Sequence, residues 1–277
     1  MLVSRSINIF SYRSLNPHNV VILHCRFKSS RQWLARQKKD QFTRQAKSDD
    51  YRSRAAYKLK EIDQSYKIFR PGQTVVDLGF APGSWSQVAV ERTRPNGRVI
   101  GLDLIAATPP QGVSSLQGNF LDPAIQEELK AMLASPDRGR FGATASDPLE
   151  MDVDKAHADV VLSDMCGIWP QTSGFWINSI NTSYSLANVS GNAVRDHGRS
   201  MDMCDAALVF CMKVLAPHGS LVMKFYTGPE DNLFEQRLKR AFKRVYRMKP
   251  EATRDESKEA YFVALNKRNV TLDEVFS

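Results

Sequence analysis

Three acidic residues at the ends of predicted strands are the first candidates for chemistry in this chain. The strands expected over 74–78, 98–102 and 159–162 are short and apolar, and Asp77, Asp103 and Asp164 lie at or next to their ends. Asp103 follows Asp77 by 26 residues, a position from which an acid can accept bonds from both hydroxyls of a ribose, although a helix N-cap or a surface acid is the alternative. The pattern predicts charged groups gathered at one edge of a sheet.

A lysine inside an apolar strand is the second candidate. Lys224 stands in the segment LVMKFY over 221–226. Lysines rarely occupy a buried strand unless they are paired or functional, and an edge lysine whose ammonium reaches solvent is the alternative. Lys58, in an apolar helical pattern, and Glu259, just before the last predicted strand, resemble surface residues when each is considered alone.

The stretch VVDLGFAPGSWSQVA over 75–89 predicts a strand, a glycine turn and a helix. Gly79 and Gly83 permit backbone angles and close approaches that a Cβ would forbid, and Pro82 stiffens the turn. Ser84 is the expected N-cap, and Trp85 could pack on a cofactor or in the core. The dinucleotide pattern G-x-G-x-x-G is absent, so this turn predicts either a different nucleotide-like ligand or a structural turn.

The elements that must position these residues alternate along the chain. Strands are expected over 74–78, 98–102, 113–116, 159–162, 221–226 and 261–265, and helices over 54–64, 85–91, 123–133, 202–215 and 233–242. This alternation predicts a single α/β domain with a mostly parallel sheet and helices on both faces. Two long loops, near 135–157 and 168–200, are expected as insertions.

Positive charge is concentrated in two places. The net charge is +8, yet residues 1–48 hold ten Lys and Arg and one acid, so the rest of the chain nets −1. A second basic cluster is formed by Arg237, Lys239, Arg240, Lys243, Arg244, Arg247 and Lys249. This cluster predicts either a solvated helix face or a patch that contacts phosphates.

The N-terminus and the cysteines indicate a compartment. Residues 1–29 contain Arg5, Arg13, Arg26 and Lys28 and no acid, a composition typical of an organellar transit peptide, although a disordered basic tail is the alternative. The four cysteines lack zinc or CxxC spacing, which predicts a reduced compartment and no structural metal. No apolar run approaches the length of a membrane span, so no stable membrane insertion is expected.

Five segments together resemble the FtsJ-type ribosomal RNA 2′-O-methyltransferases. They are SRAAYKLKEID (53–63), DLGFAPGSWSQV (77–88), VVLSDM (160–165), LVMKFYTG (221–228) and KPEATRDESKEAYFVAL (249–265). Their order and spacing cover most of the chain. The tract over 168–202 further resembles the fungal mitochondrial branch of this family, which methylates a uridine in large-subunit rRNA.

The resemblance implies a Rossmann-like fold that binds S-adenosyl-L-methionine, with a seven-stranded sheet whose last strand is antiparallel. It assigns the family's catalytic set to Lys58, Asp164, Lys224 and Glu259. Its expected cofactor-binding residues are Gly79, Pro82, Gly83, Ser84, Trp85, Asp103, Asn119 and Asp164. Asn119 departs from the aspartate common in the family, and an amide can still accept a bond from the adenine amino group. After SDM the chain has Cys166, Gly167 and Ile168 where bacterial members have Ala-Pro-Asn, which puts the shape of the substrate-side loop in question.

The residue types suit methyl transfer to a ribose hydroxyl. The 2′-hydroxyl must lose its proton, and a buried lysine beside a second cation can accept it, because both influences favour the neutral amine. In this interpretation Lys58 supplies the second cation, while Asp164 and Glu259 hold the lysines and the hydroxyl in line.

We therefore expect a uridine-2′-O-methyltransferase of large-subunit rRNA, or of a pre-ribosomal particle, in the mitochondrial matrix. The expected organisation is a targeting segment (1–29), a basic arm (30–49), the methyltransferase domain (50–268) and a tail (269–277). Two other functions stay open: a ribosome-assembly or RNA-binding factor whose catalysis is dispensable, and a small-molecule methyltransferase. The sequence does not predict the oligomeric state.

Overall fold

The computed structural model describes residues 40–135, 157–165, 169–170, 186–187 and 192–277. The expected transit peptide, the first half of the basic arm (30–39) and most of both expected loops lie outside the described residues. Within the described part, no helix is both long enough and apolar enough to cross a membrane.

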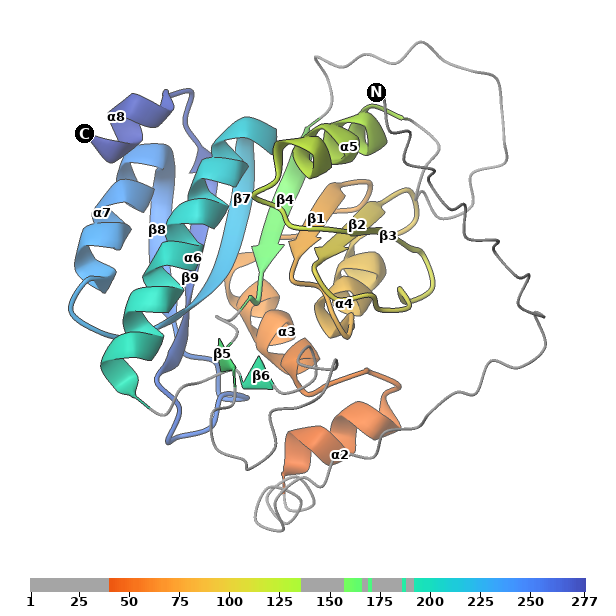
Figure 1. The fold of residues 1–277 in the computed structure, drawn as a ribbon. Helices are drawn as coiled ribbons and strands as arrows, with labels where there is room; N and C mark the ends of the chain where they lie inside the picture. The colour runs from red at the N-terminus through yellow and green to blue at the C-terminus, as the bar shows by residue number, and fades with distance from the viewer. Residues whose placement is uncertain (1–39, 136–156, 166–168, 171–185, 188–191) are drawn as a thin grey trace, which may run out of the picture. The chain divides into compact units, whose positions relative to one another are not determined.

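A seven-stranded sheet runs through the centre of the described part (Figure 1). In spatial order its strands are β3 (Val113–Gln117), β2 (Arg98–Asp103), β1 (Thr74–Leu78), β4 (Ala158–Ser163), β7 (Leu215–Tyr226), β9 (Glu259–Lys267) and β8 (Phe242–Met248). The first five are parallel, and β9 pairs antiparallel with both β7 and β8. The expected mostly parallel α/β fold and the antiparallel last strand are confirmed. A short antiparallel pair, β5 (Trp169–Pro170) and β6 (Leu186–Ala187), stands apart from this sheet.

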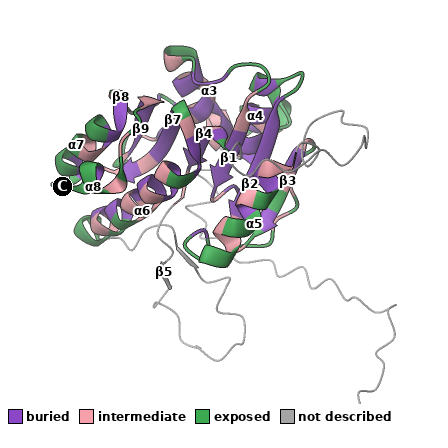
Figure 2. Cartoon of the chain, turned by 90° about the horizontal axis from the view of Figure 1, so that it is seen from above, coloured by how far each residue is buried: buried purple, intermediate pink, exposed green. Residues whose placement is uncertain are grey.

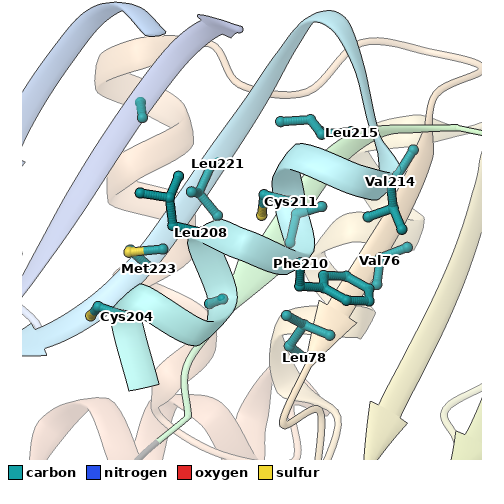
Figure 3. Packing of buried hydrophobic residues seen from close by; sticks show 14 of the residues in the cluster. Val76, Leu78, Cys204, Leu208, Phe210, Cys211, Val214, Leu215, Leu221 and Met223 are labelled. Carbon is teal, nitrogen blue, oxygen red and sulfur yellow. The ribbon is translucent and has the colours of Figure 1, made fainter. Parts of the chain in front are cut away.

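Helices cover both faces because successive side chains of each strand point to opposite faces. On one face, Val75 and Val99 pack with α3 (Ala55–Tyr66) and α4 (Ser84–Thr93). On the other, Val76 and Ile100 pack with the remaining long helices, which are α5 (Pro123–Ala134), α6 (Ala193–Val214) and α7 (Asp231–Ala241). Figure 2 shows the buried strands between helices with exposed outer sides, and Figure 3 shows α6 packed over the second face.

The compact unit extends further at both ends than the sequence predicted. It begins at Asp40 rather than near residue 50, because Asp40 caps α2 (Gln41–Ser48) and pairs with Arg54. At the other end, the expected tail forms α8 (Leu272–Phe276), whose Val275 is fully buried. The terminal segments therefore contribute to the core.

Two elements differ from their expected positions. Helix α6 begins at Ala193, inside the segment expected as a loop up to residue 200, because the Asn192 side chain accepts bonds from the backbone N–H groups of Val194 and Arg195. The basic run after α7 forms the edge strand β8, which the sequence did not predict because Lys243, Arg244 and Arg247 interrupt its apolar residues. Charged side chains are common on edge strands, where they discourage further pairing.

The topology brings the candidate residues to one edge of the sheet. Strands β1, β2, β4 and β7 are parallel, so the segments that carry Asp77, Asp103, Asp164 and Lys224 end at the same edge. Glu259 joins them because it begins the antiparallel strand β9 and pairs in register with Tyr226.

Candidate active site

Lys224 and Asp164 form the ion pair nearest the middle of this edge. Lys224 Nζ lies 3.1 Å from Asp164 Oδ1 and 2.5 Å from the Asp164 backbone oxygen. The Lys224 side chain is only 8% exposed, so its ammonium depends on these acceptors rather than on water. The pairing arises because the last pair between β4 and β7 is Ser163 with Met223, which leaves the next residue of each strand side by side.

Lys58 and Glu259 form a second ion pair. Lys58 comes from α3, Glu259 from the start of β9, and Lys58 Nζ donates to Glu259 Oε1. Both side chains are mostly buried. The four residues of the expected catalytic set therefore come from separate parts of the chain and lie in one buried network.

Tyr261 connects the two ion pairs, and the sequence analysis missed it. Its hydroxyl lies 3.1 Å from Asp164 Oδ1 and 2.6 Å from Glu259 Oε1. Its ring is fully buried and packs 5.6 Å from the Trp85 ring, measured between centroids. Two signals could have identified Tyr261: it follows Glu259 by two residues in a strand, so both point to one face, and its hydroxyl stands in an otherwise apolar run.

Two members of the network, Glu259 and Tyr261, have shifted pKa values. Burial alone would raise the pKa of Glu259, but the charges of Lys58 and Lys224 and the hydrogen bonds from Lys58 and Tyr261 outweigh it, so this pKa lies below its ordinary value. Burial, together with the neighbouring Asp164 and Glu259 carboxylates, raises the pKa of Tyr261 well above its ordinary value. Tyr261 is therefore a neutral donor and Glu259 a carboxylate at working pH.

A cavity of about 410 Å³ opens directly beside Lys224 and Asp164. Of the expected cofactor-binding residues, Gly79, Pro82, Asp103 and Asp164 line it. Its remaining walls are mainly apolar, and they are formed by Ala81, Leu102, Leu104, Ile105, Gly118, Phe120, Met165 and Met203, with Arg199 and Lys224 as cations. Four of these lining residues were not predicted from the sequence, because no motif marks them: Met165, Met203, Phe120 and Arg199. They come from loops and from helix α6.

The turn between β1 and α4 requires glycine at position 79 and is held in place by Arg52. Gly79 has φ +71°, and a Cβ on it would lie 2.5 Å from Met165 Cγ. Arg52 holds this turn from outside: its Nη1 donates to the Pro82 oxygen at 2.8 Å and also to the Thr108 oxygen, while its Nη2 donates to the Pro109 oxygen at 3.2 Å. Arg52 thereby ties the glycine turn to the segment after β2.

Asp103 has two roles at the cavity. Its Oδ2 accepts from the Ala81 backbone N–H and its Oδ1 from the Ile105 backbone N–H, both at 2.9 Å. Each carboxylate oxygen can accept a further bond, so Asp103 can still receive ribose hydroxyls. Deeper in, Asp77 is buried; its Oδ2 accepts from Ser86 Oγ at 2.6 Å, and its Oδ1 has no partner among the described residues.

Four expected cofactor-binding residues do not line this cavity. Gly83, with φ +109°, is the N-cap of α4, so Ser84 is the first helical residue rather than the cap that was expected. Ser84 Oγ instead lies 2.7 Å from Ser53 Oγ. Trp85 is 2% exposed and donates from its indole N–H to the Ala55 oxygen, which makes it a core residue beneath the network. Asn119 is exposed, and its side-chain oxygen accepts from the Leu121 backbone N–H.

A mainly apolar cavity at the carboxyl ends of parallel strands, with Asp103 in its wall and a buried lysine–carboxylate network beside it, is the kind of site in which an α/β enzyme binds a nucleoside-like cofactor. Residues 51–267 match the model of the FtsJ-like methyltransferase family, and the chain belongs to this family. The enzyme is therefore a methyltransferase whose methyl donor is S-adenosylmethionine. The residues present fit this cofactor: the apolar walls suit an adenine ring, Asp103 suits a ribose, and Asp164 suits a positively charged sulfonium.

Named relatives cover nearly the whole chain. The "rRNA methyltransferase 2, mitochondrial" of Saccharomyces cerevisiae is 40% identical over 96% of this chain and 97% of its own length. The protein of the same name from Schizosaccharomyces pombe is 36% identical, over 85% of this chain and 95% of its own length. A crystal structure described as a putative ribosomal RNA methyltransferase from Plasmodium falciparum is similar with a TM-score of 0.55 and 25% identity, covering 78% of this chain and 98% of that one.

Proposed function

We propose that this enzyme transfers a methyl group to the ribose 2′-hydroxyl of a uridine in mitochondrial large-subunit rRNA. The observation that carries the proposal is the convergence of Lys58, Asp164, Lys224 and Glu259 into one buried network beside the cofactor cavity. The relatives named above support rRNA as the substrate class and the mitochondrion as the compartment. We assign the enzyme to the matrix because that is where mitochondrial rRNA is located.

The proposed roles follow from the contacts. S-adenosylmethionine supplies an electrophilic methyl group on a sulfonium. Lys224 lines the cavity beside Asp164, its ion-pair partner, so it is the group placed to accept the 2′-hydroxyl proton or to orient that hydroxyl. Lys224 now donates to two oxygens of Asp164, and it must release one of its protons before it can accept another.

Lys58, Glu259 and Tyr261 have supporting roles in this proposal. Lys58 keeps Glu259 in place, and Tyr261 holds Glu259 and Asp164 at a fixed separation. A fixed charge arrangement reduces the reorganisation needed when the proton leaves the hydroxyl.

The contacts of the basic cluster bear on whether it can bind RNA. In the basic cluster of residues 237–249, Arg237 pairs with Asp205, Lys239 with Glu235, and Arg247 with Asp231 and Glu235. Arg240 and Lys249 donate to backbone oxygens. These partners favour a structural role for most of the cluster. RNA contacts therefore belong to the edge that carries the active site and to the basic N-terminal segment.

Mapping of ribose methylation tests the proposed function. Mitochondrial rRNA is compared between cells that contain the protein, cells that lack it and cells that express Lys224→Ala. We expect one 2′-O-methyluridine of the large-subunit rRNA to disappear in the last two. An unchanged methylation map would reject the proposal, and activity on a small hydroxylated molecule would favour the small-molecule alternative. Normal ribosome assembly with Lys224→Ala would show an assembly role that does not depend on catalysis.

A further inference from the structure

Strand β4 ends before its neighbour β7 does. Beyond that point, the last residues of β7 form hydrogen bonds with side chains of helix α6. The last pair between β4 and β7 is Ser163 with Met223, so β4 offers no ladder partner to the following residues Lys224 to Tyr226. Three side chains of α6 bond the backbone there, namely those of His197, Ser200 and Cys204. We call these three side chains the α6 strap.

The contacts of the α6 strap are specific. Ser200 Oγ accepts from the Tyr226 backbone N–H at 3.1 Å and donates to the His197 oxygen at 2.8 Å. Cys204 Sγ lies 3.4 Å from the Lys224 backbone oxygen, to which it donates. Residues spaced by three, four and seven positions share one face of a helix, so the strap residues all point toward β7.

The two hydrogen-bond partners of His197 fix the tautomer of its ring. The Glu230 backbone N–H donates to Nε2 at 3.1 Å, so Nε2 is unprotonated. Nδ1 therefore carries the proton and donates to the Tyr226 oxygen at 2.7 Å. His197 is 3% exposed, and a Cβ on Gly228 would lie 2.4 Å from the His197 Cγ. The strand end, the loop after it and α6 are thus fixed to one another by one imidazole.

We propose that the α6 strap positions Lys224 for methyl transfer, an inference that rests on the proposed function. Lys224 Nζ reaches Asp164 across the gap left where the ladder between β4 and β7 ends. The direction of its side chain therefore depends on backbone atoms of Lys224 and Tyr226, which the strap holds. The strap residues touch neither the cavity nor the reacting atoms; they are positioning residues that act through the backbone of β7.

The decisive variant is Ser200→Ala, with Cys211→Ala as the matched control. Both residues are buried on α6, and Cys211 packs in the core cluster that also contains Cys204, without bonding the end of β7 (Figure 3). We expect Ser200→Ala to lower the single-turnover rate about 10-fold or more at saturating cofactor and rRNA, because misplacement of a reacting group is costly. The dissociation constant of S-adenosylmethionine should stay within about twofold of wild type, since the strap does not line the cavity. Cys211→Ala should keep the wild-type rate at a temperature where every variant is folded.

A conservative variant and an exchange measurement complete the test. Ser200→Thr keeps the hydroxyl and should restore most of the rate. Hydrogen exchange of the Tyr226 amide, measured without substrate, should become faster in Ser200→Ala and stay slow in Cys211→Ala. If wild type methylates rRNA, Lys224→Ala is inactive, and Ser200→Ala matches Cys211→Ala in rate, the positioning role is wrong while the proposed function stands. Unchanged exchange in Ser200→Ala would overturn the strap itself, whatever the activity.

Discussion

Lys224 and Tyr261 are direct partners in the antiparallel ladder between β7 and β9, and both place a polar atom 3.1 Å from Asp164 Oδ1. One carboxylate oxygen is therefore shared by an ammonium and a phenol hydroxyl from two neighbouring strands. The Tyr261 hydroxyl also contacts Glu259. A substitution at Lys224 or Tyr261 should therefore alter the geometry of both ion pairs.

Lys224→Ala should abolish methyl transfer and leave S-adenosylmethionine affinity near wild type, because we assign the lysine to the hydroxyl rather than to the cofactor. Lys224→Arg should not restore activity, since a guanidinium keeps its proton at any accessible pH and has a different shape. Single-turnover methylation and calorimetry provide the two readouts. Near-normal turnover by Lys224→Ala would remove the lysine from the mechanism and leave alignment by Asp164 and Glu259.

Tyr261→Phe keeps the buried ring and removes only the hydroxyl. We expect the single-turnover rate to fall by about 10- to 100-fold, because the variant lacks the hydroxyl that lies between Asp164 and Glu259 and shares its one proton with them. Cofactor binding should be unaffected, since Tyr261 does not line the cavity. A wild-type rate in a folded Tyr261→Phe enzyme would show that the hydroxyl is a structural contact only.

Asp103→Ala should weaken S-adenosylmethionine binding by about 1–3 kcal/mol or more, because it removes the acceptors for the ribose and for two backbone N–H groups that shape the turn. Asp103→Asn, which keeps one acceptor oxygen, should lose less. Asn119→Ala should have a smaller effect than either, since Asn119 does not line the cavity. Calorimetry of the three variants gives the order, and an unchanged affinity for Asp103→Ala would reject the ribose assignment.

Asp77 should make stability depend on pH. Burial raises its pKa to about 7 from an ordinary value of 3.8, Asp164 and Asp103 act in the same direction, and the bond from Ser86 opposes them. The Asp77 carboxyl therefore stays protonated to a higher pH in the folded state than in the unfolded state. The free energy of unfolding consequently decreases as pH rises from about 4 to about 7.

Asp77→Asn should remove that loss. Above pH 7 the variant should be more stable than wild type by as much as roughly 4 kcal/mol, and the difference should vanish near pH 4. Urea unfolding of both proteins without cofactor, measured from pH 4.5 to 8, checks the sign. A difference that does not change with pH would contradict the assignment.

The exposed end of β8 should contribute little to RNA binding. Lys243 and Arg244 are exposed and form no ion pair within the described part of the chain, and the register places them opposite the end of β9 far from Glu259. Neutralising both should leave rRNA affinity and its salt dependence nearly unchanged. Arg240→Ala, in contrast, should lower stability, because Arg240 bonds the carbonyls of Val275 and Ser277. A marked loss of rRNA affinity in the double variant would restore the cluster as a phosphate-binding patch.

The sequence by itself determined the alternation of strands and helices, the glycine turn and the acids at strand ends, because local patterns of apolar residues, Gly and Pro encode them. The family motifs added the four-residue set. The sequence missed β8, since its edge position is stabilised by pairing with β9 rather than by an apolar pattern.

Only the tertiary structure decided which charges meet. Lys58 and Glu259 are 201 positions apart, and each alone resembles a surface residue until α3 and β9 bring them together. Trp85 stands next to the glycine turn in sequence, yet packing directs it into the core against Tyr261. The contacts of Tyr261 with Asp164 and those of the α6 strap with β7 were decided by strand register and by the early end of β4, because hydrogen bonds between distant segments depend on how the chain folds.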